Sequence, residues 1–117
     1  MNYVYGYNSC STVKKSLKFL DEKKLEYIFF DFVKNQIERE VLVDLIEKSN
    51  ENIDKFFNKN GKLFKELNLK EKLPSLNNEE KLEYLLSDGK MIKRPIIVLD
   101  EKVFIGFNEQ EVEEYLK

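Results

Sequence analysis

The chain has no histidine and only one cysteine, Cys10, among its 117 residues. Without histidine it cannot build a Ser-His-Asp or Cys-His catalytic group or a metal site with imidazole ligands. A single cysteine forms neither an internal disulfide nor a thiolate metal cluster. Any redox cycle at Cys10 therefore needs a second thiol from another molecule.

Long apolar segments and an excess of positive charge are also missing. No apolar run approaches the roughly 20 residues that span a bilayer. The N-terminus lacks the basic and apolar regions of a signal peptide, so we expect a cytoplasmic protein without a membrane partner. The net charge of −2 and the pI of about 5.4 argue against direct nucleic-acid binding. Arginine is scarce, because every positive side chain except Arg39 and Arg94 is lysine.

The first part of the chain changes its hydrophobic period at Cys10. Residues 3–7 are rich in tyrosine and favour a strand, whereas apolar residues recur at helical spacing over residues 11–24. We expect Ser11 or Thr12 to cap this helix. The junction places Cys10 among free amide N–H groups at the positive end of a helix, which favours the reactive thiolate.

A second strand is predicted over residues 25–33, where β-branched and aromatic residues indicate burial on both faces. A strand, a helix and a strand within about 30 residues make a βαβ unit with parallel strands. Residues 95–99 and 103–105 are two short apolar strands whose close connection indicates an antiparallel hairpin. A last helix is predicted over residues 109–116.

Between the strand pairs, residues 36–90 or so show helical patterns. One helix is predicted over residues 38–48 and another up to residue 87, capped by Asn77. Shorter helices are expected between them. We expect one domain over residues 1–117, with this insert too rich in apolar anchors to fold separately.

The predicted order is β-α-β, a helical insert and β-β-α. This is the order of a thioredoxin or glutaredoxin fold, an α/β fold with a mixed four-stranded sheet. The insert lies between the second and third strands.

Short patterns spread over the whole chain point to a particular family. They are the tyrosine-rich turn at Cys10, Phe57-Asn58-Lys-Asn-Gly61, Phe64-Lys-Glu-Leu67, Lys72-Leu73-Pro74, Ile92-Lys-Arg94-Pro95 and Gly106-Phe107. Together they resemble the ArsC/Spx family, which comprises arsenate reductase-like and Spx/MgsR-like thioredoxin-fold proteins.

The resemblance implies roles for individual residues. Cys10 matches the nucleophilic cysteine, Arg94 matches the arginine that faces it and helps to hold an oxyanion, and Pro95 matches a proline that is cis in thioredoxin folds. Lys14 falls where relatives often carry an arginine. The residues expected to bind the anion or substrate are Ser11, Thr12, Lys14 and Pro95. No metal site is expected.

The sequence also departs from the family pattern. Val13 stands where many Spx-like relatives have the second cysteine of Cys-x-x-Cys, so an internal disulfide switch is excluded. Single-cysteine arsenate reductases lack that cysteine too, but they place two further arginines around the anion. The matching positions here are Asn58 and the neighbourhood of Gly106. This difference argues against arsenate as the substrate.

Two main hypotheses follow from the resemblance. The first is a single-cysteine thiol reductase with no bound cofactor, which acts on a small oxyanion or thiol substrate and takes glutathione or a glutaredoxin-like protein as its reductant. The alternative is an Spx/MgsR-like transcriptional regulator that binds RNA polymerase. A fold that has lost catalysis is the third.

Ordinary structural roles also stay open for the residues concerned. Cys10 could be a buried structural cysteine. Arg94 could be a surface ion-pair partner. Lys14 could be simply solvated.

Overall fold

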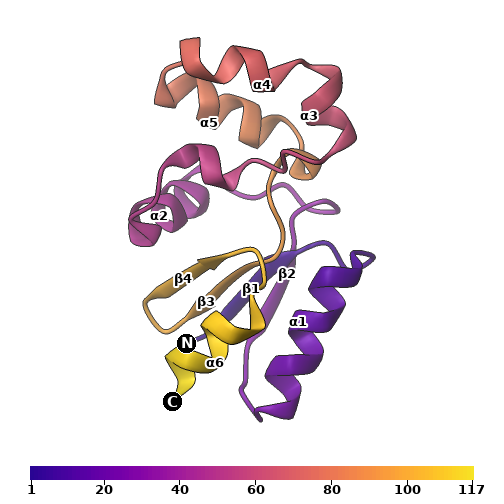
Figure 1. Ribbon diagram of the computed structural model, residues 1–117, viewed down its shortest axis with the longest axis vertical. Helices are drawn as coiled ribbons and strands as arrows, with labels where there is room; N and C mark the ends of the chain where they lie inside the picture. The colour runs from indigo at the N-terminus through magenta and orange to yellow at the C-terminus, as the bar shows by residue number, and fades with distance from the viewer.

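The computed structural model describes residues 1–117 and has a mixed four-stranded sheet with the order β2-β1-β3-β4 (Figure 1). β1 (Tyr3–Gly6) pairs in parallel with β2 (Ile28–Asp31). β3 (Ile96–Leu99) is antiparallel to β1 and to β4 (Lys102–Ile105). The predicted parallel pair, the C-terminal hairpin and the thioredoxin-like fold class are therefore confirmed.

Side chains of the sheet alternate between two faces, as the period of a strand requires. One face packs against α1 (Ser11–Glu22) and α6 (Glu109–Leu116). Its buried cluster consists of Val4, Phe19, Leu20, Ile97, Leu99, Phe104 and Val112. Ile96 and Val98 face the other side and join the core of the insert. One continuous apolar cluster thus runs from the sheet into the insert.

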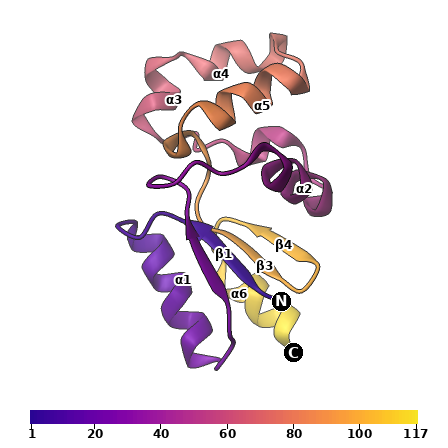
Figure 2. The ribbon, with the colours of Figure 1, turned by 180° about the vertical axis from the view of Figure 1, so that it is seen from behind.

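The insert between β2 and β3 consists of helices joined by loops and lies beyond one end of the sheet (Figures 1 and 2). Its α-helices are α2 (Arg39–Ser49), α3 (Lys62–Glu66), α4 (Leu69–Lys72) and α5 (Asn78–Ser87). Single turns of 3₁₀ helix occupy Ile53–Phe56, Leu73–Ser75 and Gly89–Met91. α2 packs against β4 and so anchors the insert to the sheet.

Two polar contacts fix α5 in the insert. The Asn77 side chain accepts a hydrogen bond from the Glu80 N–H at 2.8 Å, and the Glu80 carboxylate accepts one from the Asn77 N–H at 3.0 Å. This capping box confirms the predicted cap. Arg39 pairs with Glu79 and Glu83, which ties α2 to α5.

The prediction that the second strand is buried on both faces is wrong. β2 is short and lies at the edge of the sheet with β1 as its only neighbour. Ile28 is 48% exposed, and only Asp31 in this strand is buried. Strand order follows from tertiary pairing, so the composition of one strand did not reveal its edge position.

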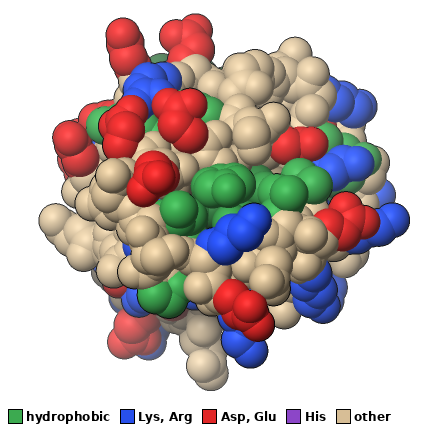
Figure 3. Space-filling model, turned by 90° about the horizontal axis from the view of Figure 1, so that it is seen from above, with side chains coloured by type: hydrophobic (Ala, Val, Ile, Leu, Met, Phe, Trp, Pro, Cys, Tyr) green, Lys and Arg blue, Asp and Glu red, His purple; other side chains and the backbone are tan.

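Figure 3 views the molecule from the end that carries the insert. Positive and negative side chains are interspersed there around a strip of hydrophobic side chains. No helix in the structure has the length and apolar character that crossing a bilayer requires.

Candidate functional site

Cys10 occupies the N-cap position of α1, directly after the turn that follows β1. Its N–H donates to the carbonyl oxygen of Tyr7 at 3.0 Å, and its own carbonyl oxygen accepts from the Lys14 N–H at 3.0 Å. The backbone of Cys10 is extended, with φ −79° and ψ 126°. The Cys10 thiol therefore lies at the N-terminal end of α1, just after the turn that connects β1 to this helix.

Ser11 and Thr12 do not cap the helix, contrary to the prediction. They lie inside its first turn with exposed side chains, and no side chain caps α1. The cap position belongs to Cys10 because its carbonyl oxygen is the first to accept an intrahelical hydrogen bond. As a result, the N–H groups of Ser11, Thr12 and Val13 form no hydrogen bond to a protein oxygen.

These open N–H groups act on the Cys10 thiol. Partial burial by itself raises the pKa of Cys10, but the N–H groups of Val13 and Thr12 and the guanidinium of Arg94 outweigh it. The pKa of Cys10 is therefore lower than that of a free thiol. The arrangement favours the thiolate, the form that attacks disulfides and other electrophiles.

Arg94 approaches the thiol from the other end of the chain. Its guanidinium carbon lies over the ring of Tyr7, 5.6 Å from the ring centre. Its Nη1 is buried and has no hydrogen-bond partner within the protein. A buried donor without a partner is costly, so this nitrogen is available to a negatively charged sulfur or ligand beside Cys10.

Arg94 and Pro95 directly precede β3. The Arg94–Pro95 peptide bond is cis in the structure. The carbonyl oxygen of Pro95 accepts a hydrogen bond from the Gly106 N–H at 2.7 Å, and the Lys93 N–H donates to the carbonyl oxygen of Phe56 at 2.7 Å. The segment that carries Arg94 is thus held by both the hairpin and the insert.

Asp31 supports the turn that leads into Cys10, and the sequence pattern did not predict this role. Its carboxylate accepts hydrogen bonds from the N–H groups of Asn8, Val33 and Lys34 at 3.2, 2.9 and 2.9 Å. Burial raises the pKa of Asp31, but these three N–H groups lower it further, so the net shift is downward. An aspartate at the end of an apolar strand was the available signal.

The sequence also drew attention to Lys14, Asn58 and Gly106. Lys14 has an exposed side chain on α1. The side-chain amide of Asn58 donates a hydrogen bond to the carbonyl oxygen of Lys90 at 3.4 Å. Gly106 has φ +83°, and the Lys93 side chain passes over it. The positions that the resemblance matches to the two further arginines, Asn58 and the neighbourhood of Gly106, therefore carry no guanidinium.

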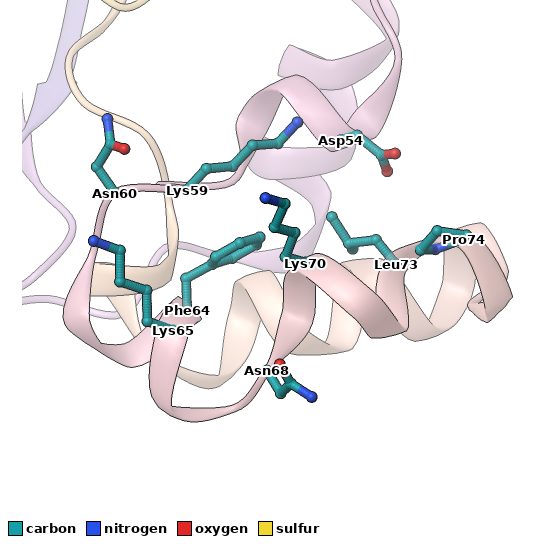
Figure 4. Close-up of a pocket in the computed structure, with 9 residues that line it drawn as sticks. All are labelled: Asp54, Lys59, Asn60, Phe64, Lys65, Asn68, Lys70, Leu73 and Pro74. Carbon is teal, nitrogen blue, oxygen red and sulfur yellow. The ribbon is translucent and has the colours of Figure 1, made fainter.

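A hollow lies in the insert, and neither Cys10 nor Arg94 lines it (Figure 4). It is about 640 Å³ in volume and is lined by Lys59, Lys65 and Lys70, with Asp54 as its one acidic residue. Lys81 pairs with Asp54 at 2.8 Å. The reactive sulfur and its cation lie elsewhere, so this hollow is not part of the Cys10 site. No group of three or more Cys, Asp or Glu side chains is placed to hold a metal ion.

Comparison with known proteins gives the same family at every level. Residues 5–115 match the model of the ArsC family. The chain is 43% identical over 110 residues to the uncharacterized protein YusI of Bacillus subtilis. This match covers 94% of this chain and 93% of YusI. It is 28% identical over 116 residues to the global transcriptional regulator Spx 2 of Bacillus cereus, covering 99% of this chain and 87% of that protein.

A solved structure extends the likeness to three dimensions. It is a protein from Streptococcus mutans described as a possible arsenate reductase, and it matches with a TM-score of 0.84 and 33% identity. The match covers 97% of this chain and 98% of that one. With nearly its whole length matched in sequence and in structure, the chain belongs to the ArsC family.

Proposed function

We propose that the chain is a thiol reductase that works through Cys10 and takes its electrons from an external thiol. The observation that carries the proposal is the convergence of Arg94 and the amides of Thr12 and Val13 on one sulfur, which lowers its pKa. A thiolate held in this way is both a nucleophile and a good leaving group. Membership of the ArsC family supports the same chemistry.

The reaction that fits these groups is thiol–disulfide exchange. The Cys10 thiolate attacks one sulfur of a disulfide R–S–S–R′, forms Cys10–S–S–R and releases R′–S⁻, which takes a proton from water. The thiolate of glutathione or of a glutaredoxin-like protein, R″–S⁻, then attacks the mixed disulfide and restores the Cys10 thiolate. The net reaction converts R–S–S–R′ and R″–SH into R–S–S–R″ and R′–SH.

Arg94 and the helix amides serve both steps in the same way. They stabilise the negative charge on the Cys10 sulfur before the first attack and after the second. Val13 leaves the chain without an internal resolving thiol, so the second step requires the external one.

A disulfide fits the site better than arsenate does. The resemblance implies two further arginines around a bound oxyanion, and the matching positions here are Asn58 and the neighbourhood of Gly106, where this chain has no arginine. Asn58 is engaged with the backbone of Lys90. One guanidinium beside the thiol suffices for a thiolate, whereas a multiply charged tetrahedral anion calls for several donors.

The test is reduction of a glutathione mixed disulfide, with glutathione as reductant and a parallel assay with arsenate. The wild-type protein is expected to turn over the disulfide, and Cys10→Ser, which keeps the size of the side chain, is expected to lose the activity. A matched Ser9→Ala variant changes the neighbouring exposed residue and should behave like the wild type. A Cys10→Ser protein as active as its parent in both assays contradicts the proposal.

A second candidate function is regulation of transcription through RNA polymerase. It is favoured by the likeness to Spx 2, which extends over 99% of this chain. Because Val13 removes the Cys-x-x-Cys switch, binding in this case would not depend on an internal disulfide. Co-purification with RNA polymerase subunits supports this function, and a pull-down that recovers none of them contradicts it.

A further inference from the structure

The hollow in the insert gathers positive charge from three segments of the chain. It has a volume of about 640 Å³, and its lining includes Lys59, Lys65 and Lys70. Lys59 lies before α3, Lys65 belongs to α3 and Lys70 belongs to α4. Figure 4 shows the three lysines around one space, with Phe64 among them. Folding of the insert therefore brings these ammonium groups to a common site.

The charge of these three lysines is not neutralised by neighbouring acidic residues. Asp54 is the one acidic residue that lines the hollow, and it pairs with Lys81 at 2.8 Å. Glu66 pairs with Lys62 at 3.8 Å. The Glu71 carboxylate accepts a hydrogen bond from a side-chain amide at 3.0 Å. The nearby carboxylates are thus engaged elsewhere, and the three lysines of the hollow form no ion pair.

A smaller groove continues the hollow along the surface. It has a volume of about 370 Å³, shares Lys59 and Asn60 with the hollow, and adds Lys55 and Lys93. No acidic residue lines the groove. Lys55 pairs with Glu51 at 2.7 Å, but Lys93 forms no ion pair. We call the hollow and the groove together the basic surface, and its unpaired cations are Lys59, Lys65, Lys70 and Lys93.

The basic surface lies at the positive end of a molecule with strongly asymmetric charge. Residues 55–72 contain six lysines and two glutamates, whereas residues 100–117 contain six acidic residues and two lysines. α3 and α4 lie at one end of the long axis of the molecule, and α6 lies at the other (Figure 1). A field of this kind directs a negatively charged partner toward the insert, although the net charge of the protein is −2.

The composition of the basic surface favours a carboxylate partner over a nucleic acid. Its aromatic residues, Phe57 and Phe64, are only 2% and 4% exposed and pack against each other with ring centres 5.9 Å apart. They therefore offer no open face on which a base can stack. None of the cations is an arginine, whose planar fork matches a phosphate. A lysine ammonium pairs with a carboxylate without requiring a fork geometry.

We propose that the basic surface is a docking site for an acidic peptide segment of a partner protein, with several carboxylates along an extended stretch. Two depressions in series suit an extended chain, which advances roughly 3.3 Å per residue. Lys59 lines both depressions and so serves as the central cation. The proposal goes beyond the reductase function, because neither Cys10 nor Arg94 lines either depression.

The test is binding of a fluorescein-labelled peptide of about eight residues, composed of glutamates and two leucines, to the full-length protein. Fluorescence anisotropy is the readout. Lys59→Gln/Lys70→Gln should weaken binding about three- to tenfold, as expected for two exposed charge pairs. Lys15→Gln/Lys18→Gln makes the same change in net charge on exposed positions of α1 and should bind like the wild type. Raising NaCl from about 50 to about 300 mM should weaken wild-type binding, because it shortens the Debye length.

Two further variants of the experiment separate charge from shape. Lys59→Arg/Lys70→Arg keeps both charges and should retain most of the affinity. A peptide with glutamine in place of every glutamate should not bind. Binding of the glutamine peptide with equal affinity, no saturable binding of the acidic peptide to the wild type, or equal losses in Lys59→Gln/Lys70→Gln and the α1 control would each overturn the proposal.

Two other occupants of the basic surface give distinct results. If single-stranded oligothymidine binds more tightly than the peptide and depends on Lys59 and Lys70, the surface is a nucleic-acid site and the proposal is wrong. If sedimentation velocity shows salt-sensitive self-association that Lys59→Gln/Lys70→Gln abolishes, the occupant is a second copy of this chain and the proposal is likewise overturned. A monomer that binds the acidic peptide in preference to the oligonucleotide is the expected result.

Discussion

The guanidinium carbon of Arg94 lies 5.6 Å from the centre of the Tyr7 ring, above the turn that leads into Cys10. A guanidinium over an aromatic face gains a modest cation–π stabilisation. This contact holds the charge on the side of the thiol, where it lowers the pKa of Cys10 together with the helix amides. The site is thus assembled from both ends of the chain.

Replacing Arg94 should raise the pKa of Cys10. Arg94→Met removes the guanidinium, which lowers the pKa of Cys10 as a charge and as a hydrogen-bond donor, so the midpoint of alkylation against pH should move upward. Arg94→Lys keeps the charge but loses the planar guanidinium, so its alkylation midpoint should lie between those of the wild type and Arg94→Met. Below the new midpoint, the rate of reaction with iodoacetamide should fall because less thiolate is present.

The other arginine provides the control for this experiment. Arg39→Met breaks exposed ion pairs with Glu79 and Glu83 and should leave the alkylation profile of Cys10 unchanged. An Arg94→Met profile that coincides with the wild-type profile would show that Arg94 does not act on the thiol.

Asp31→Asn should destabilise the protein at neutral pH. The native carboxylate accepts three backbone N–H groups, and hydrogen bonds to a charged group contribute about 1.5–3 kcal/mol. We expect the free energy of unfolding to fall by about 1–3 kcal/mol at pH 7, measured by urea denaturation.

The pH dependence of this effect has a definite sign. The pKa of Asp31 is lower in the folded state than in the unfolded chain, where it is about 3.9. Its stabilising contribution is therefore complete above the unfolded value and is lost as the pH falls through the folded value. The difference between wild type and Asp31→Asn should shrink below pH 4 or so. Asp100→Asn, at an exposed turn, should show little change, and a pH-independent difference for Asp31→Asn would contradict the account.

Gly6→Ala should displace α1, the helix that Cys10 precedes as its N-cap residue. A Cβ atom at Gly6 would lie 2.8 Å from Cγ2 of Val13, which is fully buried. Overpacking of this kind costs about 1–3 kcal/mol. In the double mutant with Val13→Ala the clash is removed, so the combined loss should be smaller than the sum of the two single losses in urea denaturation. Additive losses would show that Gly6 and Val13 do not interact.

Local sequence patterns predicted most of the fold. The change from period 2 to helical period at Cys10 located β1 and α1, and the close spacing of two apolar runs near the C-terminus identified the hairpin. The last helix was predicted with the bounds that the structure has, Glu109–Leu116. These elements are decided by neighbours in the chain, which is why their prediction succeeded.

Features that depend on contacts between distant segments were not predictable in the same way. The edge position of β2 follows from the strand order, which no single strand encodes. The support that Asp31 gives to Asn8 arises only when β2 lies beside β1. The place of Lys93 over Gly106 likewise depends on the meeting of the insert and the hairpin. Arg94 was found by resemblance, because local spacing does not indicate which residue it faces.

The pKa of Cys10, measured from the rate of alkylation by iodoacetamide as a function of pH, tests the central claim most directly. The reductase account predicts a value clearly below the ordinary value of about 8.5 for a free thiol, because Arg94 and the amides of Thr12 and Val13 outweigh the effect of burial. A value at or above 8.5 or so would contradict the account, since the thiol would then be an ordinary cysteine at neutral pH.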